Sequence, residues 1–152
     1  RAGERAEAKG YSQVLWLDGV ERKYVEEGGG MNVMFKIGGT VVTPALTGSI
    51  LRGITRKSSI ELLKSWGVLV EERLLSVDEL FKAAESGALE EAWCVGTAAV
   101  VSPIGTLSWD GRDYPINGNK IGALSRRLYD ELTGIQWGTR PDPFGWTCRV
   151  SE

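Results

Sequence analysis

Residues 32–43 read NVMFKIGGTVVT, two apolar runs that flank the pair Gly38-Gly39. A two-glycine connection between such runs is a strong signal for a tight hairpin, because glycine adopts the positive φ angles that a two-residue turn requires. Pro44 follows the second run and ends it. The sequence therefore predicts antiparallel strands over 32–37 and 40–43.

Further helices and strands are expected on both sides of this hairpin. Apolar residues at helical spacing, or capping residues, predict helices over 4–9, 55–66, 76–87 and from Asn119 to Gly134. Short apolar runs bounded by turn residues predict strands over 13–17, 23–26, 68–70, 91–95, 98–103 and 106–109, with Asp110-Gly111 as a second hairpin turn. Residues 137–152, rich in Gly, Pro and Trp, are expected to be irregular.

The order of these elements indicates the fold class. Strand runs outnumber helices, which favours a mixed sheet with flanking helices over a regular parallel, doubly wound sheet. No repeat, low-complexity tract or linker divides the chain. The expected class is therefore α/β, with an α+β-like mixed sheet, in a single domain over residues 1–152.

The composition is that of an ordinary folded protein. Of the 152 residues, 42% are hydrophobic and 25% are charged, and the formal net charge is -2. Acidic and basic residues are interspersed, so no basic face for nucleic acid or for an anionic membrane is expected. No apolar run approaches the roughly 18 residues that span a bilayer. Small molecules or proteins are the partners that this composition favours.

Histidine is absent, and the chain has two cysteines. Without histidine, Ser-His-Asp and Cys-His nucleophilic sites and every histidine-based metal site are excluded. Cys94 and Cys148 lie far apart, in no metal-binding or redox spacing, and are interpreted as free thiols of a reducing compartment. We therefore expect no metal site.

The run Gly53-Ile54-Thr55-Arg56 ends a loop and begins a predicted helix. The free backbone N–H groups of a first helical turn, with the helix dipole behind them, suit a phosphate. Gly53 allows close approach of the backbone, and Thr55 is a candidate cap. The structural alternative is an ordinary capped helix start, which this run favours when it is taken alone.

The run Gly96-Thr97-Ala98 lies between two apolar strand runs. A polar break at a strand end is a common place for ligand-binding groups in α/β enzymes, and Thr97 offers a hydroxyl there. The structural alternative is a β-bulge or a tight bend that needs glycine, which is favoured when this run is taken alone.

Glu27 stands before three glycines, residues 28–30, at the end of a predicted strand. A carboxylate beside backbone without side chains leaves room for a planar ring, and next to a pyridinium nitrogen it would keep that nitrogen protonated, as in pyridoxal-phosphate enzymes. The alternative is a solvated surface glutamate before a loop.

Together, these segments resemble one family in their order and spacing. The runs that carry the resemblance are residues 13–19 (QVLWLDG), Glu27 with residues 30–32 (GMN), residues 53–56 (GITR) and residues 94–98 (CVGTA). They are similar to those of the class IV aminotransferases, and specifically of the branched-chain amino-acid aminotransferases. The resemblance covers nearly the whole chain and implies the C-terminal large domain of fold type IV aminotransferases.

The resemblance implies that pyridoxal 5'-phosphate is the cofactor. Glu27 would then pair with its pyridine nitrogen. The backbone amides of Ile54 and Thr55 would hold its phosphate, and Thr97 would add a hydroxyl to the same phosphate.

The resemblance also implies that Gly30, Met31 and Ala98 line the substrate pocket. Some relatives have threonine where this chain has Gly30, so a hydroxyl contact is lost there. Some animal members carry a Cys-x-x-Cys pair that matches Ala99 and Ser102, so no thiol redox switch is expected here.

The resemblance places the catalytic residue outside the chain. In the family, the lysine that forms the Schiff base precedes a Gly-Gly-Asn-Tyr run, upstream of the segment that matches residues 13–19. Neither feature is present, and none of the lysines has that context. Residues 1–152 are therefore expected to be one cofactor-binding domain, a fragment whose N-terminal domain and catalytic lysine precede Arg1.

For the whole protein, the resemblance implies transamination between leucine, isoleucine or valine and 2-oxoglutarate, in a cytoplasmic homodimer. The isolated fragment is expected to be inactive. The expected partners are amino-acid and 2-oxo-acid substrates and the protein's own N-terminal domain. Three alternatives stay open, namely a D-amino-acid aminotransferase, an aminodeoxychorismate lyase and a non-catalytic phosphate-binding module.

Overall fold

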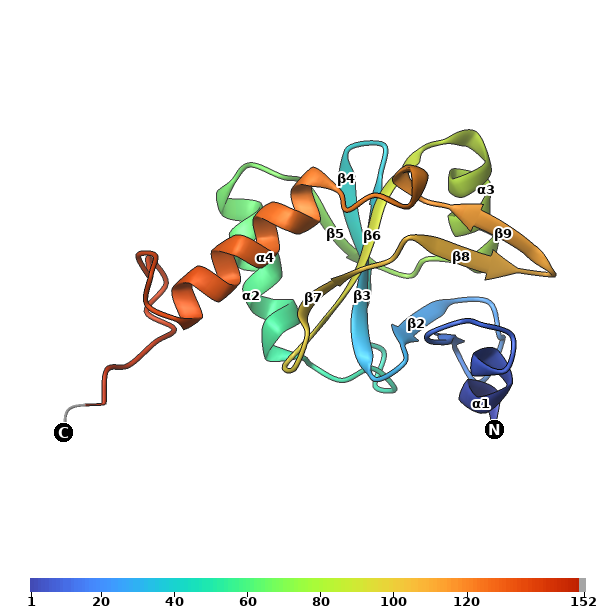
Figure 1. Ribbon diagram of the computed structural model, residues 1–152, viewed down its shortest axis with the longest axis horizontal. Coiled ribbons are helices and arrows are strands. Elements are labelled where there is room, and N and C mark those ends of the chain that lie inside the picture. Colours follow the sequence, from blue (N-terminus) through green and yellow to red (C-terminus); the bar gives the residue numbers. More distant parts are fainter. Residues whose placement is uncertain (151–152) are drawn as a thin grey trace.

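The computed structural model describes residues 1–150; Ser151 and Glu152, at the end of the tail expected to be irregular, lie outside the described residues. A seven-stranded sheet carries helices on both faces, beside a two-stranded sheet (Figure 1). The helices are α1 (Ala2–Glu7), α2 (Ile54–Ser65), α3 (Val77–Ser86), the 3-10 turn η1 (Asn117–Asn119) and α4 (Ala123–Gln136). The strands are β1 (Leu15–Leu17), β2 (Val25–Gly28), β3 (Met31–Ile37), β4 (Thr40–Pro44), β5 (Val70–Arg73), β6 (Leu89–Gly96), β7 (Val100–Pro103), β8 (Thr106–Trp109) and β9 (Arg112–Pro115). Among the described residues, no helix combines the length and the apolar character needed to cross a membrane.

Strand β3 is the centre of the large sheet. One of its edges pairs with β6 in antiparallel fashion from Asn32 to Ile37, and the other edge is shared by two strands. β2 pairs with its beginning, through Glu27 and Asn32, and β4 pairs with its end, through Val42 and Phe35. Between these partners the Val33 carbonyl accepts a hydrogen bond from the Thr43 hydroxyl at 2.8 Å, so the divergence of β2 and β4 leaves no unpaired carbonyl there.

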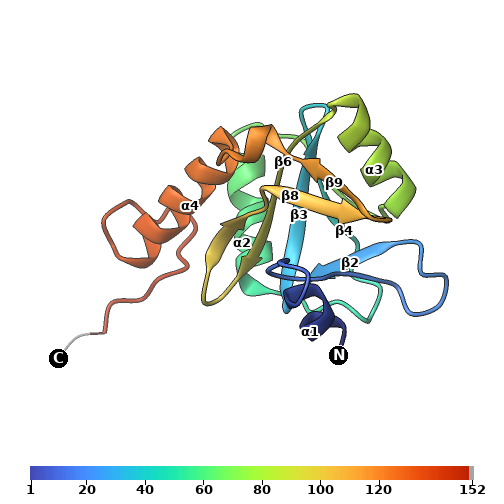
Figure 2. The same cartoon turned by 45° about the vertical axis from the view of Figure 1, so that its right-hand side comes forward.

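The sheet has an apolar layer on each face. On β6, Ala92 and Cys94 belong to the core under α3 and the β8–β9 hairpin, whereas Trp93 and Val95 belong to the core under α2 and α4. This alternation is the period of two that places successive side chains of a strand on opposite faces. Figure 2 shows α2 and α4 on one side of β3 and α3 with β8 and β9 on the other. The expected mixed sheet is confirmed, since β4 and β5 are parallel and the other strand pairs are antiparallel.

The local turn and capping signals are confirmed. Gly38 and Gly39 have φ angles of 55° and 81° and connect β3 to β4, and Asp110 and Gly111 have φ angles of 50° and 75° and connect β8 to β9. The Ser76 hydroxyl accepts a hydrogen bond from the backbone N–H of Glu79 at 3.1 Å and caps α3, as its spacing predicts.

Helix α4 begins and ends later than predicted. It begins at Ala123 instead of near Asn119, because η1 forms a separate turn before it. It also runs past Gly134, the predicted end, to Gln136. The left-handed glycine that follows the helix is Gly138, with a φ of 67°, whereas the Arg140 side chain packs across Gly134, where a Cβ would lie 2.5 Å from the Arg140 Cδ.

Two strands also differ from the prediction. β2 continues through Glu27 and Gly28, because Gly28 pairs with Met31 across a tight connection, so the glycines expected to interrupt the strand form its turn into β3. β5 spans Val70–Arg73 and not 68–70, because parallel pairing with β4 selects this polar stretch. Strand pairing decides both cases, locally for β2 with β3 and over a longer stretch of chain for β5 with β4, and apolar runs alone do not reveal it.

A buried carboxylate fixes the start of α4. The Glu91 side chain of β6 accepts hydrogen bonds from the backbone N–H groups of Leu124 at 3.0 Å and Ser125 at 2.9 Å. A Cβ on the N-cap residue Gly122 would overlap this carboxylate. A tertiary contact therefore satisfies the first amides of the helix, where local caps usually act.

We predict that Glu91→Ala lowers the free energy of unfolding by about 2 kcal/mol, because it leaves two buried helix amides without an acceptor. Urea unfolding followed by circular dichroism measures the change. Asp130→Ala is the control, since it removes an exposed ion pair of the same helix and should cost less than about 0.5 kcal/mol. Equal losses in the two variants would contradict the capping role of Glu91.

Candidate functional site

The residues predicted to bind a cofactor all lie at one end of the large sheet, the lower end in Figure 1. β3 begins at this end, and β4 and β6 finish there because both run antiparallel to β3. The residues are Glu27 near the end of β2, Ile54 and Thr55 at the start of α2, and Thr97 directly after β6.

The Glu27 carboxylate is held by the protein on one side. Its Oε1 accepts a hydrogen bond from the backbone N–H of Leu51 at 3.0 Å, and the Asn32 side-chain amide lies 3.5 Å away from the same oxygen. Oε2 has no hydrogen-bond partner within residues 1–150. A half-buried carboxylate with one fixed and one open oxygen differs from a freely solvated surface glutamate.

The start of α2 presents free backbone donors. Gly53 is the N-cap, with an extended ψ of 132° and no side-chain cap, so the expected capping by Thr55 is wrong and Thr55 lies inside the first turn. The N–H groups of Ile54 and Thr55 have no partner among the described residues. The first turn also contains no acidic residue. These donors and the positive end of the helix dipole therefore suit an anion.

Arg56 fixes this helix start to the sheet. Its guanidinium is buried, donates a hydrogen bond from Nη2 to the Pro44 carbonyl at 3.0 Å, and forms an ion pair with Glu72 at 3.0 Å. Pro44 ends β4 and Glu72 belongs to β5, so one side chain connects the first turn of α2 to two strands. No role was predicted for Arg56 from the sequence. The only signal was its position as a basic residue between an apolar strand run and an apolar helix run.

Thr97 lies in the exposed turn between β6 and β7. Gly96 opposes Val100 in this hairpin, and Val100 has a φ of 57°, a strained conformation for a β-branched residue. A Cβ at Gly96 would lie 3.1 Å from the Met31 Cγ, so the glycine allows the turn to approach β3 closely. The expected strand over 98–103 begins only at Val100.

The residues predicted to line a substrate pocket lie around the same sheet end. Gly30 and Ala98 are exposed in the β2–β3 and β6–β7 turns, and Met31 is half-buried at the beginning of β3. Met31 contacts the Gly96 turn, so these two turns are neighbours.

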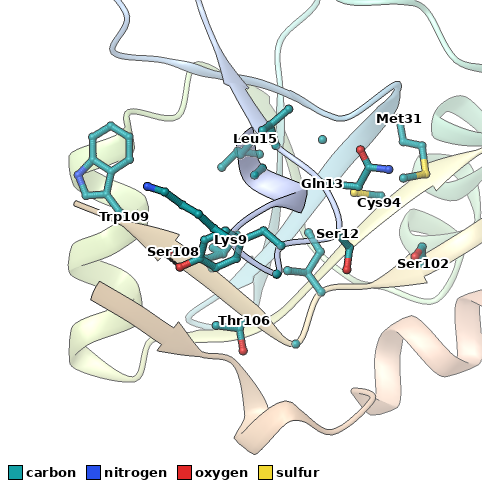
Figure 3. Close-up of a pocket in the computed structure, with 18 of the residues that line it drawn as sticks. Lys9, Ser12, Gln13, Leu15, Met31, Cys94, Ser102, Thr106, Ser108 and Trp109 are labelled. Atoms are coloured by element: carbon teal, nitrogen blue, oxygen red, sulfur yellow. Dashed lines mark hydrogen bonds between the residues drawn. The ribbon is translucent and has the colours of Figure 1, made fainter. Parts of the chain in front are cut away.

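A hollow of about 920 Å³ lies on the α3 face of the sheet. Figure 3 shows Lys9, Gln13 and Met31 around it. Met31 is the one residue of the predicted site that lines the hollow. No pattern in the sequence indicates this hollow, because its walls come from segments far apart in the chain, including α1, the segment before β1, β6 and β8.

Burial raises the pKa of the Cys94 thiol, on the wall of this hollow, to about 11. Cys148 is exposed in the tail, and both cysteines are free thiols, as expected.

We predict that iodoacetamide modifies Cys148 at least about a hundredfold faster than Cys94, because the thiolate is the reactive form and each pKa unit changes its amount tenfold. Peptide mapping by mass spectrometry of the folded protein under mildly alkaline conditions measures both rates. Unfolding in urea should make the rates equal. Comparable rates in the folded protein would contradict the burial of Cys94.

Comparison with known proteins gives a consistent result. The sequence model of the family described as amino-transferase class IV matches residues 1–107. Branched-chain-amino-acid aminotransferase 2 of Bacillus subtilis is 54% identical over 151 residues, and a probable branched-chain-amino-acid aminotransferase of Staphylococcus aureus is 55% identical over 151 residues. Each alignment covers 99% of this chain and 42% of the relative, so the chain spans less than half the length of these relatives.

Solved structures of branched-chain amino acid aminotransferases have the same fold. The Escherichia coli protein superposes with a TM-score of 0.78 at 32% identity, covering 95% of this chain and 44% of that one. The T.th. protein, complexed with N-(5'-phosphopyridoxyl)-L-glutamate, gives a TM-score of 0.79 at 32% identity, with 95% and 44% coverage. These neighbours confirm the expected fold type IV architecture. The chain belongs to the class IV aminotransferase family.

Proposed function

We propose that the protein carrying this chain transfers amino groups between branched-chain L-amino acids and 2-oxoglutarate with pyridoxal 5'-phosphate, and that residues 1–152 are its cofactor-binding domain. The observation that carries the proposal is the juxtaposition, at one sheet end, of the Glu27 carboxylate and the free amides of Ile54 and Thr55. The names of the relatives support the branched-chain substrates over the D-amino-acid and lyase alternatives.

The residues present fit a pyridoxal phosphate. A phosphate needs donors and positive potential, which the start of α2 offers, and the Thr97 hydroxyl would be a further donor. A pyridine ring needs an anionic partner for its nitrogen, which the open Oε2 of Glu27 offers. When it is bound, the cofactor supplies an electron sink for the substrate carbon that gains or loses a proton.

Glu27 would hold a proton on the ring nitrogen. A carboxylate close to a pyridinium favours the charged form of that ring. Because the Leu51 N–H fixes Oε1, the carboxylate does not have to reorganise during the reaction. The helix start would meanwhile orient the cofactor through its phosphate.

Three residues would shape the substrate pocket. Gly30 and Ala98 leave space because they have little or no side chain, and Met31 offers a flexible apolar surface. Such a wall suits aliphatic side chains and gives no partner to a charged one. For the protein as a whole, the proposal also includes a catalytic lysine, a homodimer and a cytoplasmic location.

Substrate assays of the full-length protein test the proposal. With 2-oxoglutarate as acceptor, L-leucine, L-isoleucine and L-valine should be transaminated, each with a far larger kcat/KM than D-alanine. Aminodeoxychorismate should give no product. Preferred turnover of D-alanine or of aminodeoxychorismate would contradict the substrate assignment, and failure to bind the cofactor would contradict the proposal as a whole.

We predict that Glu27→Gln in the full-length protein lowers kcat about a hundredfold, because the amide cannot supply the negative charge at the ring nitrogen. Steady-state transamination of L-leucine measures the loss. Glu26→Gln is a matched control on the same strand. The Glu26 carboxylate accepts a hydrogen bond from the Ser49 hydroxyl and does not lie in the site, so the kcat of this variant should stay close to wild type. An unchanged kcat in Glu27→Gln would remove the electron-sink role.

A further inference from the structure

Asn32 is a buried polar residue in the apolar strand β3. It is 6% exposed and lies at the sheet end that carries Glu27 and the start of α2. Its Nδ2 donates a hydrogen bond to the Leu51 carbonyl at 3.0 Å and lies 3.5 Å from Oε1 of Glu27. Both neighbours only accept hydrogen bonds, so the amino group of the amide has to face them.

The opposite side of the amide contacts Gly53. A Cβ on Gly53 would overlap Oδ1 of Asn32, so the N-cap of α2 packs directly on this side chain. The Leu51 carbonyl also accepts a hydrogen bond from the Gly53 N–H at 2.9 Å. The Asn32 side-chain amide therefore contacts both Leu51, which holds Glu27, and Gly53, which precedes α2.

The loop that connects β4 to α2 has few contacts besides those of Leu51: the Ala45 N–H donates a hydrogen bond to the Arg73 carbonyl, and the Ser49 hydroxyl donates one to the Glu26 carboxylate. Of residues 45–53, only Ile50 is buried, and Leu51 is 71% exposed. The backbone of Leu51 is nevertheless fixed on both sides, with its N–H on Glu27 and its carbonyl on Asn32. Polar contacts thus hold the chain that leads into the helix.

We propose that Asn32 is a positioning residue that holds the Glu27 carboxylate and the amide end of α2 at a fixed separation. This inference rests on the proposed function. The cofactor is rigid, so its ring nitrogen and its phosphate can bind together only when their partners keep the right distance. Asn32 sets this distance through Leu51 and Gly53, without a role in the chemistry.

The test compares Asn32→Leu with Thr43→Val in the full-length protein. Leucine has the same branching at Cγ as asparagine, although it is larger, and removes the hydrogen bonds of the amide. Thr43→Val also removes a buried hydrogen bond next to β3, to the Val33 carbonyl, but touches none of the residues that connect Glu27 to α2. Thermal unfolding reports the loss of stability that the two variants share.

Two readouts separate positioning from simple stability. The dissociation constant for pyridoxal phosphate, from equilibrium dialysis, should rise at least about tenfold in Asn32→Leu and less than about twofold in Thr43→Val. Hydrogen–deuterium exchange of the cofactor-free protein should show faster exchange in the segment containing Leu51 and Gly53 in Asn32→Leu alone. Equal dissociation constants, or unchanged exchange at this segment, would overturn the proposal.

Asn32→Asp is the second variant if Asn32→Leu does not fold. It keeps the size of the side chain but turns an acceptor toward Glu27 and the Leu51 carbonyl. It should weaken cofactor binding at least about tenfold, and more so at higher pH, where the introduced carboxyl group is charged; wild-type affinity would overturn the proposal. If the wild-type protein binds no cofactor, the proposed function fails, whereas the exchange experiment still reports on the contacts of Asn32.

Discussion

The site depends on the way one edge of β3 is shared. β2 pairs only with the beginning of this edge and β4 only with its end, so the two partners diverge. The loop from β4 returns across this divergence and bonds to Glu27 and Asn32 through the Leu51 backbone. A carboxylate and a helix start that lie far apart in the sequence therefore meet because the sheet opens at this point.

Buried polar groups make this arrangement rigid. Asn32 and Arg56 are both almost fully buried beside the first turn of α2, where an unpaired amide or guanidinium is costly. Each is paired with a carbonyl or a carboxylate, and these partners belong to β2, β4, β5 and the connecting loop. Moving the helix start would break several of these bonds at once. The backbone amides at the start of α2 are thus held in a fixed position.

The sequence predicted what local chemistry determines. The glycine pair of the β3–β4 hairpin, the Ser76 cap and the helix after Gly53 were predicted correctly, because each depends on neighbours in the chain. The start of α4 was not predicted correctly, because the Glu91 carboxylate that caps this helix comes from β6. β5 was misplaced for the same reason, since only its pairing with β4 identifies it as a strand.

The candidate site divides in the same way. The runs around Glu27, Gly53 and Thr97 were identifiable as segments, but the sequence contained no evidence of how they touch. The roles of Asn32 and of the Leu51 backbone follow from strand register and from a returning loop, which are long-range properties. Segments with a recognisable local pattern are therefore easier to identify from the sequence than residues that hold other residues in place.

The central claim is that Glu27 faces the ring nitrogen of a cofactor whose phosphate lies at the start of α2. The most direct test is the nitrogen-15 chemical shift of the ring nitrogen of labelled pyridoxal phosphate, bound to the full-length protein. We expect a protonated nitrogen in the wild-type protein at neutral pH and an unprotonated one in Glu27→Gln. An unprotonated nitrogen in the wild type, or the same shift in both proteins, would contradict this claim.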